Sequence, residues 1–130
     1  MKNRVIEQFN TYHLHDVGVV FLNMNFAENE IEIKFRLWDD LQSKEAFVSY
    51  KFSGISKFQS EYHPDFEFVV TGCHLAECSE IETDKYEASF VFELKYENRD
   101  IPAWEVVIGF TGLELIGGLS EEALKYKYEC

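Results

Sequence analysis

The sequence contains two copies of one apolar pattern, and this repeat restricts the chain to folds built from two related halves. Residues 48–55 and 106–113 each combine an alternating apolar segment, a hydroxyl residue, a glycine and a branched aliphatic residue. Upstream, Ile31, Ile33, Phe35 and Leu37 match Phe90, Phe92, Leu94 and Tyr96, and Asp16-Val17-x-Val19 matches Asp65-Phe66-x-Phe68. The copies lie about 49 to 59 residues apart, which indicates a duplicated β unit.

The 130 residues correspond to a single domain. Its two halves are predicted at about residues 12–60 and 62–118. The boundary falls at His63-Pro64-Asp65, because proline cannot donate a hydrogen bond to a neighbouring strand. Twelve Phe and seven Tyr residues supply apolar surface for a packed core.

Alternating apolar residues predict about eight strands with short connections. An acidic connector is expected from Glu77 to Asp84. Residues 2–11 predict a short N-terminal helix capped by Asn3, and residues 119–128 fit a helix capped by Ser120 or an edge strand, of which we favour the helix. The expected fold is mainly β, with helical segments only at the ends: an antiparallel sheet of two four-strand halves curled into a sandwich or partial barrel. The expected strands cover residues 17–22, 31–37, 47–52, 55–58, 66–75, 86–96, 103–110 and 113–116.

The chain has a formal net charge of −12, and the negative charge is concentrated in its second half. Residues 1–60 carry seven basic and eight acidic residues, whereas residues 61–130 carry five and sixteen. This balance disfavours nucleic acid and membrane surfaces as partners and favours a basic protein, although acidity also keeps a protein soluble. The predicted partner-binding residues are five acidic residues and an aromatic anchor: Glu77, Glu80, Glu82, Asp84, Glu87 and Tyr86.

Two groups of residues could bind a metal ion. His13 and His15 alternate around Leu14, so in a strand both imidazoles would face the same side, and Asp16 could orient one of them. The alternative is a structural role at the start of a strand, because zinc needs three or four protein ligands.

Cys73, His74 and Cys78 form the second group, with the composition of a soft metal site or an activated thiolate. Adjacent strand residues face opposite sides, so a buried cysteine acting as a small apolar residue is favoured. With Cys130 the chain has an odd number of cysteines and lacks an export signal, which predicts reduced thiols and a cytoplasmic location.

Motifs that would identify an enzyme are missing from the sequence. It has no glycine-rich phosphate loop, no Gly-x-Ser-x-Gly elbow, no His-Glu-x-x-His helix and no dinucleotide fingerprint. The sequence therefore favours a protein without catalytic activity and without a cofactor.

Three motifs within residues 13–58 carry a family resemblance: His15-Asp16-x-x-Val19, Ile31-x-Ile33-x-Phe35 and Val48-x-Tyr50-x-Phe52-x-Gly54-Ile55. Together they resemble small bacterial β-rich proteins, including immunity proteins of the immunity protein 50 type. The resemblance implies an inhibitor that binds the active face of a toxin, with no catalysis and no cofactor. It transfers no functional residue to this chain.

The preferred hypothesis is a non-enzymatic binding protein whose acidic second half binds a basic partner. One rival is a β domain that binds a small molecule inside a curled sheet, or a metal at His13 and His15. Another is a homodimer joined through an edge strand.

Overall fold

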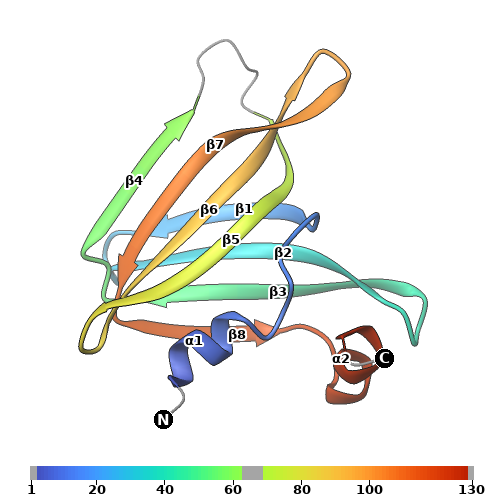
Figure 1. The fold of residues 1–130 in the computed structure, drawn as a ribbon, viewed down its shortest axis with the longest axis horizontal. Helices are drawn as coiled ribbons and strands as arrows, with labels where there is room; N and C mark the ends of the chain where they lie inside the picture. Colours follow the sequence, from blue (N-terminus) through green and yellow to red (C-terminus); the bar gives the residue numbers. More distant parts are fainter. Residues whose placement is uncertain (1–2, 63–68, 129–130) are drawn as a thin grey trace.

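The computed structural model describes residues 3–62 and 69–128, which form two four-stranded antiparallel sheets. The elements are α1 (Arg4–Phe9), β1 (Gly18–Asn25), β2 (Glu30–Asp39), β3 (Lys44–Ser53), β4 (Lys57–Tyr62), β5 (Val70–Glu82), β6 (Lys85–Tyr96), β7 (Arg99–Phe110), β8 (Gly112–Gly117) and α2 (Glu121–Tyr128). The first sheet has the order β1-β2-β3-β8, and the second has the order β4-β7-β6-β5. In Figure 1 the strands of the two sheets cross at a steep angle. The predicted fold class, mainly β with two four-strand halves, is confirmed.

The two halves of the chain exchange their last strands. In each half the first three strands form an antiparallel meander, β1-β2-β3 or β5-β6-β7. The fourth strand then crosses to the other sheet, so that β4 pairs with β7 and β8 pairs with β3. The predicted boundary at residues 63–65, and the Asp65 to Phe68 part of the repeat, lie outside the described residues.

The repeated hydroxyl-glycine pairs form the two corners where the chain changes sheet. These corners touch, because the Thr111 N–H donates to the Ser53 carbonyl (3.0 Å). Gly54 has a φ of +63°, and a Cβ there would overlap Oγ1 of Thr111. A Cβ on Gly112 would overlap Oγ of Ser53 in the same way. Each glycine therefore leaves room for the hydroxyl residue of the other copy.

The strand register corrects how the upstream parts of the repeat correspond. Phe52 and Phe110 precede the hydroxyl-glycine pair in each copy of the repeat, and their cross-strand partners are Ile31 and Tyr86. The structure thus equates Ile31 with Tyr86, four residues before the predicted match, Phe90. Alternation repeats every two residues, so the apolar pattern alone could not distinguish these registers.

Most of the segment that was expected to be an acidic connector, Glu77 to Asp84, belongs to strand β5. β5 continues to Glu82 and pairs with β6 up to Lys85, leaving a tight turn at Thr83 and Asp84. Asp84 has a φ of +61°, which aspartate tolerates better than most residues. The prediction was wrong because the acidic residues were interpreted as a solvated loop, whereas Glu77 lies on the outer face of a long hairpin and the others lie toward its end.

Both predicted terminal helices are present and capped as expected. The Asn3 side chain accepts hydrogen bonds from the N–H groups of Val5 and Ile6 at the start of α1. Oγ of Ser120 accepts a hydrogen bond from the Ala123 N–H (3.1 Å) at the start of α2, so residues 121–128 form a helix rather than an edge strand. Within the described residues, neither helix has the length and apolarity to cross a membrane.

Aromatic side chains fill the space between the sheets. Phe90 on β6 contacts the rings of Phe35 and Phe52 from the opposite sheet, with 6.1 Å between ring centroids in each pair. Phe9 from α1 completes the cluster at 5.8 Å from Phe90. The Tyr50 hydroxyl donates to the Phe9 carbonyl (2.8 Å), so the one polar group of this cluster is satisfied.

Candidate functional site

The segment between α1 and β1 forms a seam between the two sheets. The Asp16 N–H donates to the Cys73 carbonyl and the Cys73 N–H donates to the Val17 carbonyl, both at 2.8 Å. Asp16 adopts a left-handed conformation with a φ of +62°. This reciprocal pair of hydrogen bonds fixes residues 15–17 against β5.

His15, Asp16 and His74 converge at this seam. His15 Nδ1 lies 2.8 Å from Oδ2 of Asp16. The centroids of the His15 and His74 rings are 5.2 Å apart. Each of the three residues offers a ligand atom within 4.8 Å of the other two, and all three are accessible to solvent. Two imidazoles and a carboxylate so arranged have the composition of a transition-metal site.

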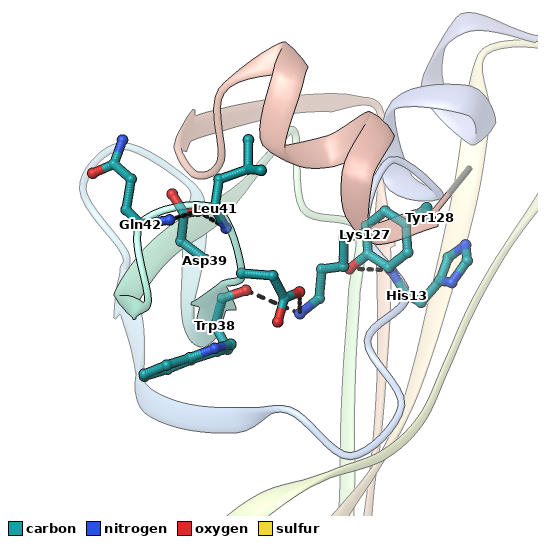
Figure 2. A network of polar contacts seen from close by, with 8 residues as sticks. His13, Trp38, Asp39, Leu41, Gln42, Lys127 and Tyr128 are labelled. Carbon is teal, nitrogen blue, oxygen red and sulfur yellow. Dashed lines mark hydrogen bonds and ion pairs between the residues drawn. The ribbon is translucent and has the colours of Figure 1, made fainter. Parts of the chain in front are cut away.

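His13, which the sequence placed beside His15, turns toward α2 instead. The centroid of its ring lies 4.1 Å from that of Tyr128. Its backbone N–H donates to the Tyr128 hydroxyl (3.3 Å; Figure 2). Residues 13–15 are not part of a strand, and Leu14 between the histidines is buried. The structure therefore places His15, but not His13, in the three-residue group. Sequence reasoning paired His74 with cysteines and missed its contact with His15.

A groove of about 390 Å³ lies next to the three-residue group. Figure 2 shows its wall, where Lys127 of α2 donates to the Trp38 carbonyl (2.9 Å) and contacts Asp40 (3.4 Å). The side chain of Asp39 accepts from the N–H groups of Leu41 and Gln42 and holds the adjacent β2-β3 turn. Side chains of both charges and two aromatic rings line the groove: His13, His15, Asp16, Arg36, Trp38, Glu45, Lys127 and Tyr128.

The cysteines near His74 are poor candidates for thiolate chemistry. Cys73 is buried and its thiol donates to the Leu75 carbonyl (3.5 Å). Burial raises the pKa of Cys73 to about 12 and that of Cys78 to about 11. Both are free thiols, and Cys130 lies outside the described residues. The neutral thiol of Cys73 packs as a small apolar group, as expected.

Stability is expected to fall above pH 9 because of Cys73. Its pKa in the folded protein is about 12, against an ordinary value of 9.0. Below pH 9 the thiol is neutral in both states and the contribution is complete, whereas above pH 9 only the unfolded state loses the proton. From pH 8 to pH 10, the free energy of unfolding of the natural protein should drop about 1.4 kcal/mol more than that of Cys73→Ala, measured by urea denaturation. Equal losses would contradict this assignment.

The predicted partner-binding acids do not share one surface. Glu77 and Glu87 lie on the outer face of the second sheet, and Glu87 pairs with Lys57 at 3.3 Å. Glu80 points to the opposite side, where Oε2 accepts from the Asn3 side chain (3.2 Å).

The remaining predicted residues lie at the hairpin end and in the core. Glu82 contacts Lys85 at 3.5 Å beside the turn that contains Asp84. Tyr86, expected as an exposed anchor, is only 6% exposed and stacks on Phe110. This expectation was wrong because Tyr86 falls on the inward side of β6, in register with the core.

Three further glutamates lie on the outer face of the second sheet and were not predicted from the sequence as partner-binding residues. Glu61 of β4 lies directly opposite Glu105 of β7. Glu93 of β6 faces the same way, since its neighbours Phe92 and Leu94 are buried. Alternation indicates which side each occupies, but only the strand order shows that they share a face with Glu77.

No protein-family model matches this chain, and no curated protein is significantly similar to it.

Proposed function

We propose that this chain is a non-enzymatic cytoplasmic binding protein that recognises a basic protein through the outer face of the β4-β7-β6-β5 sheet. The supporting observation is an excess of negative charge on that face. Lys57 pairs with Glu87, and Lys95 lies opposite Asp100 in the strand register. Among the described residues of this face, four glutamates are left in excess, and we call them the acidic face: Glu61, Glu77, Glu93 and Glu105.

The pairing of Glu61 with Glu105 supports a binding role. Like charges directly opposite one another on neighbouring strands destabilise a sheet. The cationic side chains of a partner would relieve this repulsion between the two carboxylates. Removing the repulsion would make the free energy of binding more favourable. Clustered carboxylates also accelerate the encounter with a basic protein.

The acidic face surrounds an apolar centre. Val91 lies between Glu105 on one neighbouring strand and Leu75 on the other. Leu75 is 42% exposed, and Val91 and Val107 are partly exposed. A less polar centre with a charged rim is the usual composition of a protein interface. The resemblance to immunity proteins suggests a toxin as the partner.

Charge reversal tests the electrostatic part of this proposal. Binding of a fluorescent ten-residue lysine peptide, followed by anisotropy at 50 mM salt, should weaken at least tenfold in Glu61→Lys/Glu105→Lys. The same change of net charge placed elsewhere, in Glu28→Lys/Glu121→Lys, should alter affinity less than twofold. For the natural protein, affinity should decline steeply with added salt, because exposed charges are screened.

Equal weakening in both double variants would show that only net charge matters and would contradict a defined face. Salt-independent binding would exclude electrostatic recognition. The immunity version makes a separate prediction: cells producing a toxin encoded beside this chain survive with the control variant and die with Glu61→Lys/Glu105→Lys. Survival in both cases would remove the acidic face from toxin recognition.

A further inference from the structure

Two imidazoles and one carboxylate meet at the sheet seam without sharing a strand. His15 and Asp16 precede β1, whereas His74 lies in β5, almost 60 residues later in the sequence. Their ligand atoms lie within 4.8 Å of one another. We propose that these three residues bind one divalent transition-metal ion, with zinc the best match, independently of the acidic face.

The donor set selects the class of metal. Imidazole nitrogens suit zinc, cobalt, nickel and copper, whereas magnesium and calcium favour oxygen ligands. In a tetrahedral zinc site the bonds are about 2.0–2.1 Å, which places ligand atoms about 3.3 Å apart. His15 Nδ1 and Asp16 Oδ2, at 2.8 Å, are near this separation. The ligand atom of His74 lies within 4.8 Å of the other two and would have to move closer to them to reach a shared ion.

The backbone beneath the site is fixed more firmly than the side chains. The reciprocal hydrogen bonds between Asp16, Val17 and Cys73 hold both chain segments together. A Cβ at Gly72 would lie 3.0 Å from the Val17 carbonyl oxygen, so glycine permits this close approach. The β5 register shifts between Cys73 and Leu75, and this irregularity leaves His74 outside the regular pairing, beside His15.

Three protein ligands leave a fourth position for water or for an added group. His15 and Asp16 also line the groove that contains Arg36 and Trp38. The ion would connect the segment before β1 to β5 across the seam. Because the unfolded chain does not hold these ligands together, binding should stabilise the folded state.

Metal titration of the chelator-treated protein tests the site, with His13→Ala as the matched control. We expect the protein to bind one Co²⁺ or Zn²⁺ per chain with micromolar affinity. Calorimetry would measure the binding of either ion, and visible absorption would measure the binding of Co²⁺. His15→Ala and His74→Ala should each weaken binding at least tenfold, and His13→Ala less than twofold. Saturating Zn²⁺ should raise the melting temperature of the natural protein and of His13→Ala, but not that of His74→Ala.

Several outcomes would overturn the site. They are the absence of one-to-one binding at 100 μM Zn²⁺, full binding by His74→Ala, and equal losses in His13→Ala and His15→Ala. A thiolate-to-cobalt charge-transfer band would assign the ion to cysteine instead. If His15→Ala or His74→Ala melts early without metal, Asp16→Asn serves as the second variant. Asparagine tolerates the left-handed conformation of residue 16, so binding should weaken while the metal-free melting temperature stays within a few degrees.

Discussion

Gly54→Ala is expected to lower the free energy of unfolding by about 3 kcal/mol. The left-handed conformation of Gly54, at a φ of +63°, costs a residue with a Cβ about 1–2 kcal/mol. The new methyl group would also overlap Oγ1 of Thr111, and overpacking of this kind costs about 1–3 kcal/mol. Urea denaturation would measure the change as a lower midpoint with an unchanged slope.

Gly112→Ala is the matched control, because it makes the same substitution at the other corner. Gly112 is not in the left-handed region, and its methyl group would meet only the rotatable Oγ of Ser53. The expected loss is about 1 kcal/mol. Adding Ser53→Ala should recover most of it, whereas adding Thr111→Ala to Gly54→Ala should recover only the steric part.

These two pairs of single and double variants separate two contributions to the loss of stability: the cost of the left-handed backbone and the cost of steric overlap. A residual loss of about 1 kcal/mol in Gly54→Ala/Thr111→Ala would be the cost of the left-handed backbone. If Gly54→Ala proved no more harmful than Gly112→Ala, the left-handed turn would not be required at this corner. If neither hydroxyl deletion restored stability, the hydroxyl groups would not be the atoms that a Cβ at these glycines overlaps.

Alternation and repetition were sufficient to predict the fold class but not its register. The strand at Ile31–Leu37 alternates cleanly, since one side faces the core and the other faces solvent. In the next strand Val48, Tyr50 and Phe52 keep the buried side, although Ser49 between them is buried as well. The repeated glycines, Gly54 and Gly112, lie where the chain changes sheet. The exchange of β4 and β8 depends on contacts between residues far apart in the sequence, which the local pattern does not contain.

The candidate site was less predictable because it depends on irregular backbone. His15 was identified from the sequence, but its neighbour His74 is brought to it by the β5 irregularity at Cys73 and by the seam hydrogen bonds. Glu61 and Glu105 belong to strands whose pairing follows from the exchange. Tyr86 was misplaced for the opposite reason: an aromatic residue beside acids resembles an interface anchor, while its register assigns it to the core.

Phe90→Ala is expected to lower the free energy of unfolding by about 4 kcal/mol, within the usual cost of truncating a buried phenylalanine. The ring is 1% exposed and contacts aromatic rings from both sheets and α1. A loss of this size is a large fraction of the stability of a small domain. Urea denaturation of Phe26→Ala provides the control, because Phe26 is 85% exposed and its loss should change stability by about 0.5 kcal/mol or less.

The same measurement on Phe35 tests how the two halves correspond. Phe35 pairs with Val48, and Phe90 pairs with Val106, so the register makes Phe35 and Phe90 equivalent. Their rings stack on each other at 6.1 Å between the sheets. Phe35→Ala should therefore cost about as much as Phe90→Ala, and the double variant should cost less than the sum, because each ring loses the other's contact. Strict additivity would show that the two rings do not contact each other, and a much smaller loss for Phe35→Ala would contradict its central place in the shared core.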